Sequence, residues 1–400
     1  MVRNLRMAAA RVARSGAAPR MAATPAARLG AVVRMAAVAA ALAGAAAPAG
    51  AERWQVQYFY DKSKSTLALV DICFSSATRG VAVGQIQEKH RHKPVVLVTS
   101  DGGAHWLEAE APGQPLSLFF LNENSGWLVT THDLWATDEA GRSWRKVPGL
   151  PSGVVRVLFT DERTGYAAGS KKKAYKTEDG GQHWEAIAAA AEPPGEAKYS
   201  AYDWIAFANP KSGMITGWNE PPRLYPQQFP DWMDPAEAIS RYDTPHLSYN
   251  LVTNDGGTTW KAQSASLFGA VTRIRFNPEG RGLGLLRYAN SFRYPAEVYK
   301  IEWKSGKSET IYRDRRFAVS DIWLSPDGTA WLAGVVAPGQ IRNVVPGKVQ
   351  VLRSRGTDYT VWKAIDIDYR AVANAVLFAG TDDSHMWLAT DNGMILKLGD

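Results

Sequence analysis

Few side chains of this sequence stand at spacings that would support catalysis. A glycoside hydrolase needs two carboxyl groups about 5–10 Å apart, and the best acidic candidates are Asp231, Asp234 and Glu237 in the stretch FPDWMDPAEAISRYD. The pair Asp234-Pro235 is also typical of a helix start, where acidic residues form a solvated cap and first turn. We prefer that second interpretation, so the sequence yields no catalytic residue.

Other reactive motifs are equally sparse. His90 and His92 are two residues apart in a charged hairpin, and no third ligand is indicated, so they predict no metal site. Cys73, the only cysteine, lies in the apolar run Leu67–Phe74 and is expected to be a small core residue. The sequence contains no phosphate loop, dinucleotide fingerprint or nucleophile elbow. We therefore expect no metal and no cofactor.

A sialidase site would need three clustered arginines, a tyrosine nucleophile with a glutamate neighbour, and an aspartic acid. The string Arg273-Ile274-Arg275 is nearest to the arginine segment of such an enzyme, but it runs into Phe276 inside a predicted strand. A carbohydrate-active protein is therefore only an alternative to a binding protein.

Binding residues are better represented. Residues 218–249 break the repeat pattern described below and carry six aromatic residues and six prolines. Such a loop is typical of a binding surface or lid, although a loop that only covers a rim is the alternative. The candidate binding residues here are Trp218, Tyr225, Trp232 and Tyr242. A second candidate set, Arg313, Arg315 and Arg316, would line an anion-binding face or be ordinary surface charge at a strand end.

The elements that position these residues are repeats. An aromatic residue, a polar turn and a short apolar strand recur seven times, starting at Phe74, Phe120, Phe159, Phe207, Phe276, Trp323 and Phe378. Short strands and Gly-rich turns at a period of about 40–50 residues are typical of β-propellers. We predict an all-β propeller of seven blades, each a four-stranded antiparallel sheet, with a helical or irregular insertion between the fourth and fifth repeats. Six or eight blades are alternatives, because the repeats at Phe276 and Trp323 are degenerate.

A second motif, Ser/Thr-x-Asp-x-Gly-x-x-Trp, follows most repeats. It is intact in Thr99–Trp106, Thr177–Trp184 and Thr253–Trp260, and Thr137–Trp144 has Glu139 in the Asp place. The sixth repeat has no clear version, Ser354–Trp362 is an altered one, and Thr390–Gly393 is a fragment. The Asp can accept amide hydrogen bonds within its turn, the Gly allows positive φ, and the Trp packs between sheets. A structural role is thus predicted for Asp101, Gly103, Trp106, Trp144, Asp179, Gly181, Trp184, Asp255, Gly257 and Trp260.

The ends of the chain add two expectations. Trp54–Tyr60 alternates as a strand does and is predicted to pair with the last blade and close the ring. Only Ala186–Glu192 and Pro235–Arg241 are plausible short helices. Residues 52–400 are therefore expected to be a single propeller domain, with residues 218–249 as an insertion loop.

Residues 1–51 are predicted to be a targeting segment. They hold seven arginines and no other charged residue, which accounts for the whole formal charge of +7. The remaining chain is neutral, so no nucleic-acid partner is indicated. The apolar run Met35–Ala47 is too short to span a membrane, and Ala49-Gly50-Ala51 predicts cleavage after Ala51. We expect an exported protein, periplasmic or extracellular, with no transmembrane segment after cleavage.

The hairpin motif resembles the Asp-box or BNR repeat of sialidases, other glycoside hydrolases and the sortilin ectodomain. Its combination with the Phe…Gly repeats resembles the photosystem II stability and assembly factor family over about residues 67–400. That resemblance implies a seven-bladed propeller that binds a protein client, with an arginine patch at the client, but it assigns no residue of this sequence. The long insertion departs from the compact family pattern.

Three functions are therefore open at this point. The preferred one is a non-catalytic exported propeller that binds a protein client during assembly. The alternatives are a carbohydrate-active propeller and a photosystem II assembly factor in the thylakoid lumen of an alga, which would explain the long N-terminal segment.

Overall fold

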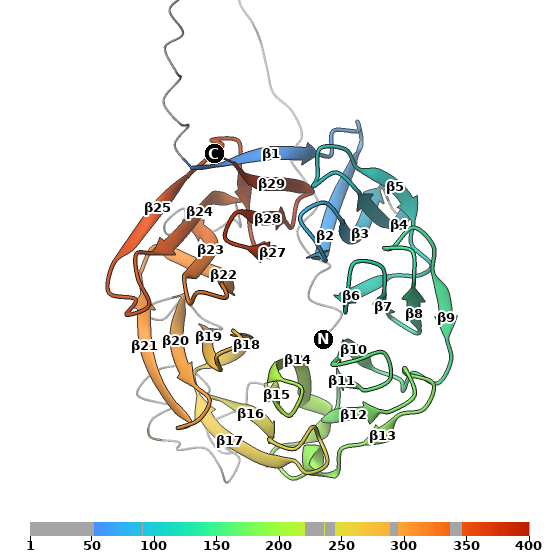
Figure 1. Ribbon diagram of the computed structural model, residues 1–400, viewed down its shortest axis with the longest axis vertical. Coiled ribbons are helices and arrows are strands. Elements are labelled where there is room, and N and C mark those ends of the chain that lie inside the picture. Colours follow the sequence, from blue (N-terminus) through green and yellow to red (C-terminus); the bar gives the residue numbers. More distant parts are fainter. Residues whose placement is uncertain are drawn as a thin grey trace, which may run out of the picture. The chain divides into compact units, whose positions relative to one another are not determined.

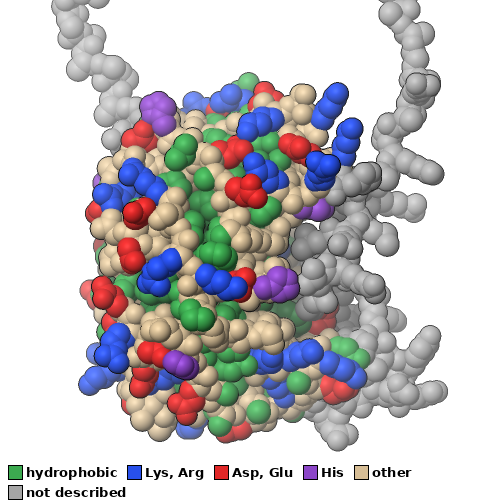
Figure 2. Space-filling view, turned by 90° about the vertical axis from the view of Figure 1, so that its right-hand side faces the viewer, with side chains coloured by type: hydrophobic (Ala, Val, Ile, Leu, Met, Phe, Trp, Pro, Cys, Tyr) green, Lys and Arg blue, Asp and Glu red, His purple; other side chains and the backbone are tan. Residues whose placement is uncertain are grey.

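The computed structural model describes residues 52–89, 91–220, 236, 245–288, 295–336 and 346–399. The chain divides into Met1–Pro48 and Ala49–Asp400, and every described residue belongs to the second unit. No helix among the described residues is long and apolar enough to cross a membrane. Basic and acidic side chains alternate over the face shown in Figure 2, in keeping with the neutral charge of this part of the sequence.

The described strands form seven four-stranded antiparallel blades arranged in a ring (Figure 1). The centre of this ring, bordered by the first strand of each blade, is called the channel below. Blade 1 contains β2 (Ser65–Phe74), β3 (Gly80–Glu88), β4 (Arg91–Thr99) and β5 (Leu107–Glu110). Blade 2 contains β6 (Pro115–Phe120), β7 (Gly126–Thr130), β8 (Leu134–Thr137) and β9 (Arg145–Val147). Blade 3 contains β10 (Val154–Phe159), β11 (Gly165–Gly169), β12 (Lys173–Thr177) and β13 (Glu185–Ala186).

The remaining blades follow in chain order. Blade 4 contains β14 (Ser200–Asn209), β15 (Ser212–Asn219), β16 (His246–Thr253) and β17 (Lys261–Leu267). Blade 5 contains β18 (Gly269–Phe276), β19 (Arg281–Tyr288), β20 (Ala296–Glu302) and β21 (Lys307–Arg313). Blade 6 contains β22 (Phe317–Leu324), β23 (Ala330–Val336), β24 (Gly347–Ser354) and β25 (Trp362–Ile367), and the short β26 (Val372–Ala373) pairs with β24.

Blade 7 is completed by the first strand of the chain, as the sequence predicts. It contains β27 (Val376–Asp382), β28 (His385–Thr390), β29 (Met394–Gly399) and β1 (Arg53–Phe59). β1 pairs antiparallel with β29, and its first residues also pair parallel with β25 of blade 6. Trp54 is fully buried at this junction, edge-on to Trp331 and tilted against Phe378. The ring is therefore closed by hydrogen bonds and by core packing.

The Asp-box hairpins join the third and fourth strands of blades 1 to 4. In blade 3 the Thr177 hydroxyl donates to Asp179 and accepts the Gly181 amide, and Asp179 also accepts the His183 amide at 2.9 Å. The same three bonds recur in blades 1 and 4. These amide and side-chain bonds lower the pKa of Asp101 and of Asp255 to about 2. Each box is thus a hydrogen-bonded closure of its hairpin.

The altered repeats depart from this pattern in particular ways. In blade 2, Glu139 accepts the Ser143 hydroxyl at 2.7 Å, and Ala140 takes the positive φ of 55° that glycines take in the intact boxes. The altered motif Ser354–Trp362 lies between β24 and β25 of blade 6, and the connection between β20 and β21 of blade 5 carries no box. In blade 5, Trp303 stands before the hairpin turn and packs edge-on against Phe276. A tryptophan in a new position thus replaces the missing one.

The connections divide between two rims, because neighbouring strands of a blade run in opposite directions. First-to-second and third-to-fourth connections, including the Asp boxes, lie at one rim. Second-to-third connections and the links between blades lie at the other.

The insertion expected between the fourth and fifth repeats lies within blade 4, between β15 and β16. Of the predicted helices, Ala186–Glu192 contains the 3₁₀ turn η1 (Ala188–Ala191), and Pro235–Arg241 lies outside the described residues except Ala236. A second 3₁₀ turn, η2 (Ala197–Tyr199), leads into β14.

Candidate binding site in the central channel

The innermost strands of six blades share one irregularity. Each has a register shift near its start, of the kind a β-bulge produces, and bulges re-aim the side chains that follow them. The residues directly after the shift are Asp71, Ser117, Arg156, Trp204, Arg273 and Asp321. Four of these six residues are charged, and the other two, Ser117 and Trp204, can donate hydrogen bonds. The same position of the repeat therefore supplies a polar side chain in six of the seven blades.

Most of these side chains bind the backbone of the next inner strand. The two carboxylates accept backbone amides: Asp71 accepts that of Leu118 and Asp321 that of Phe378, each at 2.9 Å. The other three donate to backbone carbonyls: Ser117 to Val155 at 2.8 Å, Arg156 to Asp203 at 3.2 Å, and Trp204 to Ile274 at 2.8 Å. Part of the role of this ring of residues is therefore to hold adjacent blades together.

Three guanidinium groups gather around the Trp204 indole. Those of Arg156 and Arg273 lie 4.3 Å and 4.5 Å from the centre of its ring, and that of Arg275 lies 5.2 Å away. Trp204 itself is only 7% exposed. Planar guanidinium groups stack well on indole faces, and removal of water strengthens that attraction. The indole therefore concentrates three positive charges from blades 3 and 5 beside blade 4.

The nearest carboxylates only partly satisfy these arginines. Arg156 of blade 3 lies 3.4 Å from Asp71 of blade 1, and Arg273 and Arg275 lie 3.4 Å and 3.9 Å from Asp321. Charge-assisted hydrogen bonds are shorter, at about 2.7–2.9 Å. Both carboxylates already accept two backbone amides, since each also binds the amide of the residue that follows it. Each carboxylate thus divides its acceptor sites between backbone amides and the arginines.

Unused donors remain in the cluster. The Nε groups of Arg273 and Arg275 are buried without a hydrogen-bond partner among the described residues, because the Arg273–Asp321 contact lacks hydrogen-bond geometry. A buried guanidinium donor without an acceptor is unfavourable. An added carboxylate would supply the missing acceptors, and it would enter between positive charges that an indole holds in place. The geometry therefore suits an acidic ligand group.

Asp203 links this cluster to one of the predicted binding residues. The Trp218 indole donates to Asp203 at 3.0 Å, so Trp218 lies at the edge of the channel cluster. Burial raises the pKa of Asp203, while the Trp218 bond and the charges of Arg273 and Arg156 oppose the shift. Burial likewise lowers the pKa of Arg156, and the charge of Asp71 opposes it. The cluster is thus a desolvated group of mutually dependent charges.

The other predicted binding residues lie elsewhere. Tyr225, Trp232 and Tyr242 are outside the described residues. Arg313 ends β21, and its Nε lies 2.8 Å from Glu297. Arg315 and Arg316 are exposed in the turn closed by Asp314, which accepts the amides of Arg316 and Phe317. The structure therefore does not bring these arginines to the channel cluster.

The remaining reactive candidates are not assembled into a site. Burial raises the pKa of the Cys73 thiol to about 12, with a further rise from Asp71, so it is a poor nucleophile. Among the described residues no group of three metal-ligating side chains is close enough to hold an ion. Sequence reasoning missed Arg156 and Trp204 altogether. Aligning the starts of the inner strands would have shown them, because they occupy the same repeat position as Arg273.

Comparisons with known proteins follow this architecture. No protein-family model matches the sequence. The photosystem II assembly lipoprotein Ycf48 of Synechococcus sp. strain CC9902 is 25% identical over 262 residues, which are 60% of this chain and 70% of that protein. Ycf48 of strain CC9605 is 24% identical over 301 residues, 71% of this chain and 83% of that protein. The chain resembles the photosystem II assembly factors. This confirms the resemblance stated from the Asp boxes and the Phe…Gly repeats.

Solved structures agree on the fold. YCF48 from Cyanidioschyzon merolae has a TM-score of 0.55 at 14% identity, covering 86% of this chain and 98% of that one. YCF48 bound to D1 peptide has a TM-score of 0.54 at 16% identity, covering 85% and 98%. The WD40 β-propeller domain of Doa1 has a TM-score of 0.50 at 9% identity, covering 87% and 97%. The predicted propeller fold is thus confirmed by its structural neighbours.

Proposed function

We propose that this chain is a non-catalytic propeller that binds a protein client during the assembly of a larger complex. We further propose that the arginines around Trp204 receive a carboxylate of that client. The observation that carries the second proposal is the pair of buried Arg273 and Arg275 donors without acceptors, beside the Asp321 carboxylate that already accepts two backbone amides. The first proposal rests on the similar proteins, which are named as assembly factors.

Peptide recognition is the mode of binding that we infer. One structure of similar fold is that of YCF48 bound to D1 peptide, so peptide binding occurs in a related propeller. A peptide carries carboxylates on acidic side chains and at its C-terminus, and planar guanidinium groups bind both bidentately. A channel lined by arginines would therefore recognise an acidic or terminal group, while the rest of the peptide contacts the rim.

The site of action that we infer is outside the cytoplasm. The curated relatives are named lipoproteins, which are exported proteins, and the chain begins with the Arg- and Ala-rich segment described above. We propose that residues 1–51 direct export and that cleavage after Ala51 releases the propeller into the periplasm. The only cysteine, Cys73, lies in β2 and not in that segment. N-terminal sequencing of the secreted protein tests the cleavage position.

Peptide binding in solution tests the carboxylate proposal. The probes are a D1 peptide and a scrambled peptide of the same composition, each as the free acid and as the C-terminal amide. We expect the free acid to bind more tightly than the amide. In the double variant Arg273→Gln/Arg275→Gln, that preference should be lost, with binding of the acid weakened about tenfold or more, because each charge-assisted hydrogen bond contributes roughly 1.5–3 kcal/mol.

A matched control comes from the rim. Arg315→Gln/Arg316→Gln removes the same two charges from exposed positions and should leave the acid-to-amide preference intact. Circular dichroism and thermal unfolding verify that each variant folds. If the wild type binds acid and amide equally, or if the rim variant alone abolishes the preference, the channel is not the carboxylate site. Equal binding of the scrambled peptide would show that the client differs from the D1 segment.

A further inference from the structure

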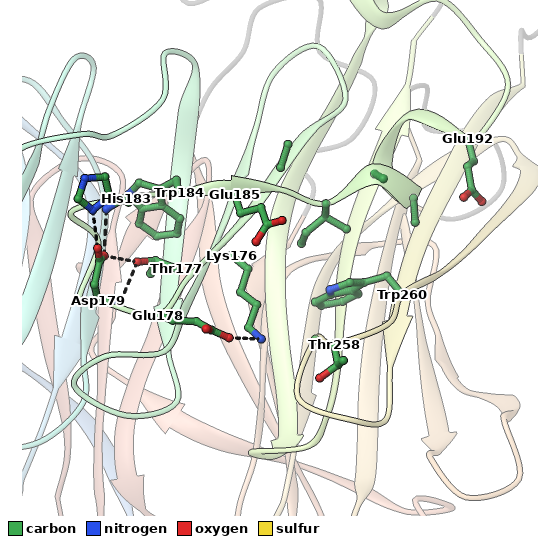
Figure 3. Close-up of a pocket in the computed structure, with 15 residues that line it drawn as sticks. Lys176, Thr177, Glu178, Asp179, His183, Trp184, Glu185, Glu192, Thr258 and Trp260 are labelled. Atoms are coloured by element: carbon green, nitrogen blue, oxygen red, sulfur yellow. Dashed lines mark hydrogen bonds and ion pairs between the residues drawn. The ribbon is translucent and has the colours of Figure 1, made fainter.

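A groove of about 870 Å³ lies between blades 3 and 4, on the outer side of the ring. Figure 3 shows its walls: the hairpin of Trp184 on one side, Lys176 of β12 and Glu185 of β13 along its middle, and Trp260 facing them from the next blade. Glu192 lies at the far end. The groove is separate from the central channel, since it is bordered by outer strands and Asp-box hairpins.

The groove exists because the outer strand of blade 3 is unusually short. β13 has only two residues, Glu185 and Ala186, and then Ile187 donates its amide to the Ala174 carbonyl as the chain turns into η1. The outer strands of the other blades run for three to seven residues. Trp260 of blade 4 lines the space beyond the end of β13.

The groove carries an excess of negative charge. Four carboxylates and one lysine border it, and two of the carboxylates are already paired: Glu178 with Lys176 at 2.8 Å and Asp179 with His183 at 2.6 Å. Glu185 and Glu192 are exposed, and no described residue forms an ion pair with either. These two carboxylates are separated by the indole of Trp260 and the buried side chains of η1.

We propose that this groove binds a basic segment of a partner protein, with lysine or arginine side chains as the recognised groups. The ammonium or guanidinium group would sit at Glu185 or Glu192, and an aromatic face attracts such a cation further. The alkyl stem of the same side chain would lie along Ile187 and Ala189, since lysine and arginine bury their stems on apolar surface. Charge complementarity thus selects a cationic occupant. The proposal does not depend on the channel site.

Peptide titration tests this proposal. The probe is a capped peptide of three Lys-Ala-Gly repeats, compared with the same peptide in which norleucine replaces lysine. We expect binding of the lysine peptide only, with an affinity that falls between about 50 and 300 mM salt as the Debye length shortens. Glu185→Gln/Glu192→Gln should weaken binding about fivefold, a small effect because exposed ion pairs contribute little individually.

Three comparisons decide the outcome. Glu110→Gln removes an exposed carboxylate from the outer strand of blade 1 and should bind like the wild type. Arg273→Gln/Arg275→Gln should also bind like the wild type, which separates this groove from the channel. The proposal is overturned if the norleucine peptide binds equally, if the Glu185/Glu192 and Glu110 variants behave alike, or if the groove takes an oligosaccharide without salt dependence.

Discussion

Replacing Trp54 with alanine should weaken the closure of the propeller ring. Trp54 is the only fully buried residue of β1, and β1 joins blade 7 to blade 6. The backbone pairing of β1 with β29 stays available in the variant. The change therefore tests the packing at the junction rather than the strand pairing.

The expected loss follows from burial. Truncating a buried tryptophan to alanine costs about 3–5 kcal/mol. The indole Nε1 of Trp54 is buried without a hydrogen-bond partner among the described residues, so its removal also relieves an unfavourable group. We therefore expect the lower part of that range, about 3–4 kcal/mol. In a domain of this size, such a loss lowers Tm by roughly 4–6 °C.

Thermal unfolding followed by circular dichroism measures this effect, with chemical denaturation as a second probe. Phe59→Ala is the matched control, because Phe59 lies in the same strand and is 56% exposed. Exposed substitutions of this kind change stability by less than about 0.5 kcal/mol. A Tm for Trp54→Ala within 1 °C of the wild type would refute the conclusion that β1 locks the ring. So would equal losses in the two variants.

Three further predictions concern the Asp boxes. Ala140→Gly should raise the stability of blade 2 by about 1 kcal/mol in denaturant titration, because a non-glycine residue at positive φ is strained. Glu139→Asp should raise the free energy of unfolding by about 0.5–1 kcal/mol, because the shorter carboxylate would accept the backbone amide that the Asp of an intact box accepts. No gain would mean that the bond from the Ser143 hydroxyl to Glu139 stabilises the hairpin equally well. The folded-state pKa of about 2 for Asp101 and Asp255 lies below the unfolded value of about 3.9, so their stabilisation is present above pH 4 and disappears as pH falls toward 2. Asp101→Asn/Asp255→Asn should flatten that acid transition, and an unchanged pH profile would contradict this assignment.

The propeller could be predicted because its determinants are local. A Thr, an Asp and a Gly within five residues, together with the amide two residues further on, make all three bonds of a box hairpin, so the sequence of blade 3 alone specifies that turn. Closure of the ring was predictable from the alternation in Trp54–Tyr60. The insertion predicted between the repeats that start at Phe207 and Phe276 falls between β15 and β16 of blade 4. Each repeat begins with an inner strand, so a segment that follows the second strand still belongs to the same blade.

The channel cluster could not be predicted in the same way. Arg156, Trp204 and Arg273 lie in three different blades and meet only because the ring brings their inner strands together. Each is a single polar or aromatic residue in an otherwise ordinary strand. The string Arg273-Ile274-Arg275 drew attention as a possible enzyme motif. Its chemical meaning comes from the Trp204 indole of a neighbouring blade and from the Asp321 carboxylate, which also accepts two backbone amides.

The pairing of β1 with β29 also determines how this chain could be rearranged. Arg53 and Gly399 are register partners, so the two ends of the propeller are neighbours in one sheet. A short linker could therefore join them, and a new start could be placed in an exposed link between two blades, such as the turn with Arg315 and Arg316 between blades 5 and 6. Such a circular permutant would place all four strands of blade 7 in one continuous stretch and would move the seam to another blade. The seam is the blade that is built from both ends of the chain, and chain connectivity determines which blade that is. Moving the seam would also move the part of the ring that opens first, and the strands of every blade would stay the same.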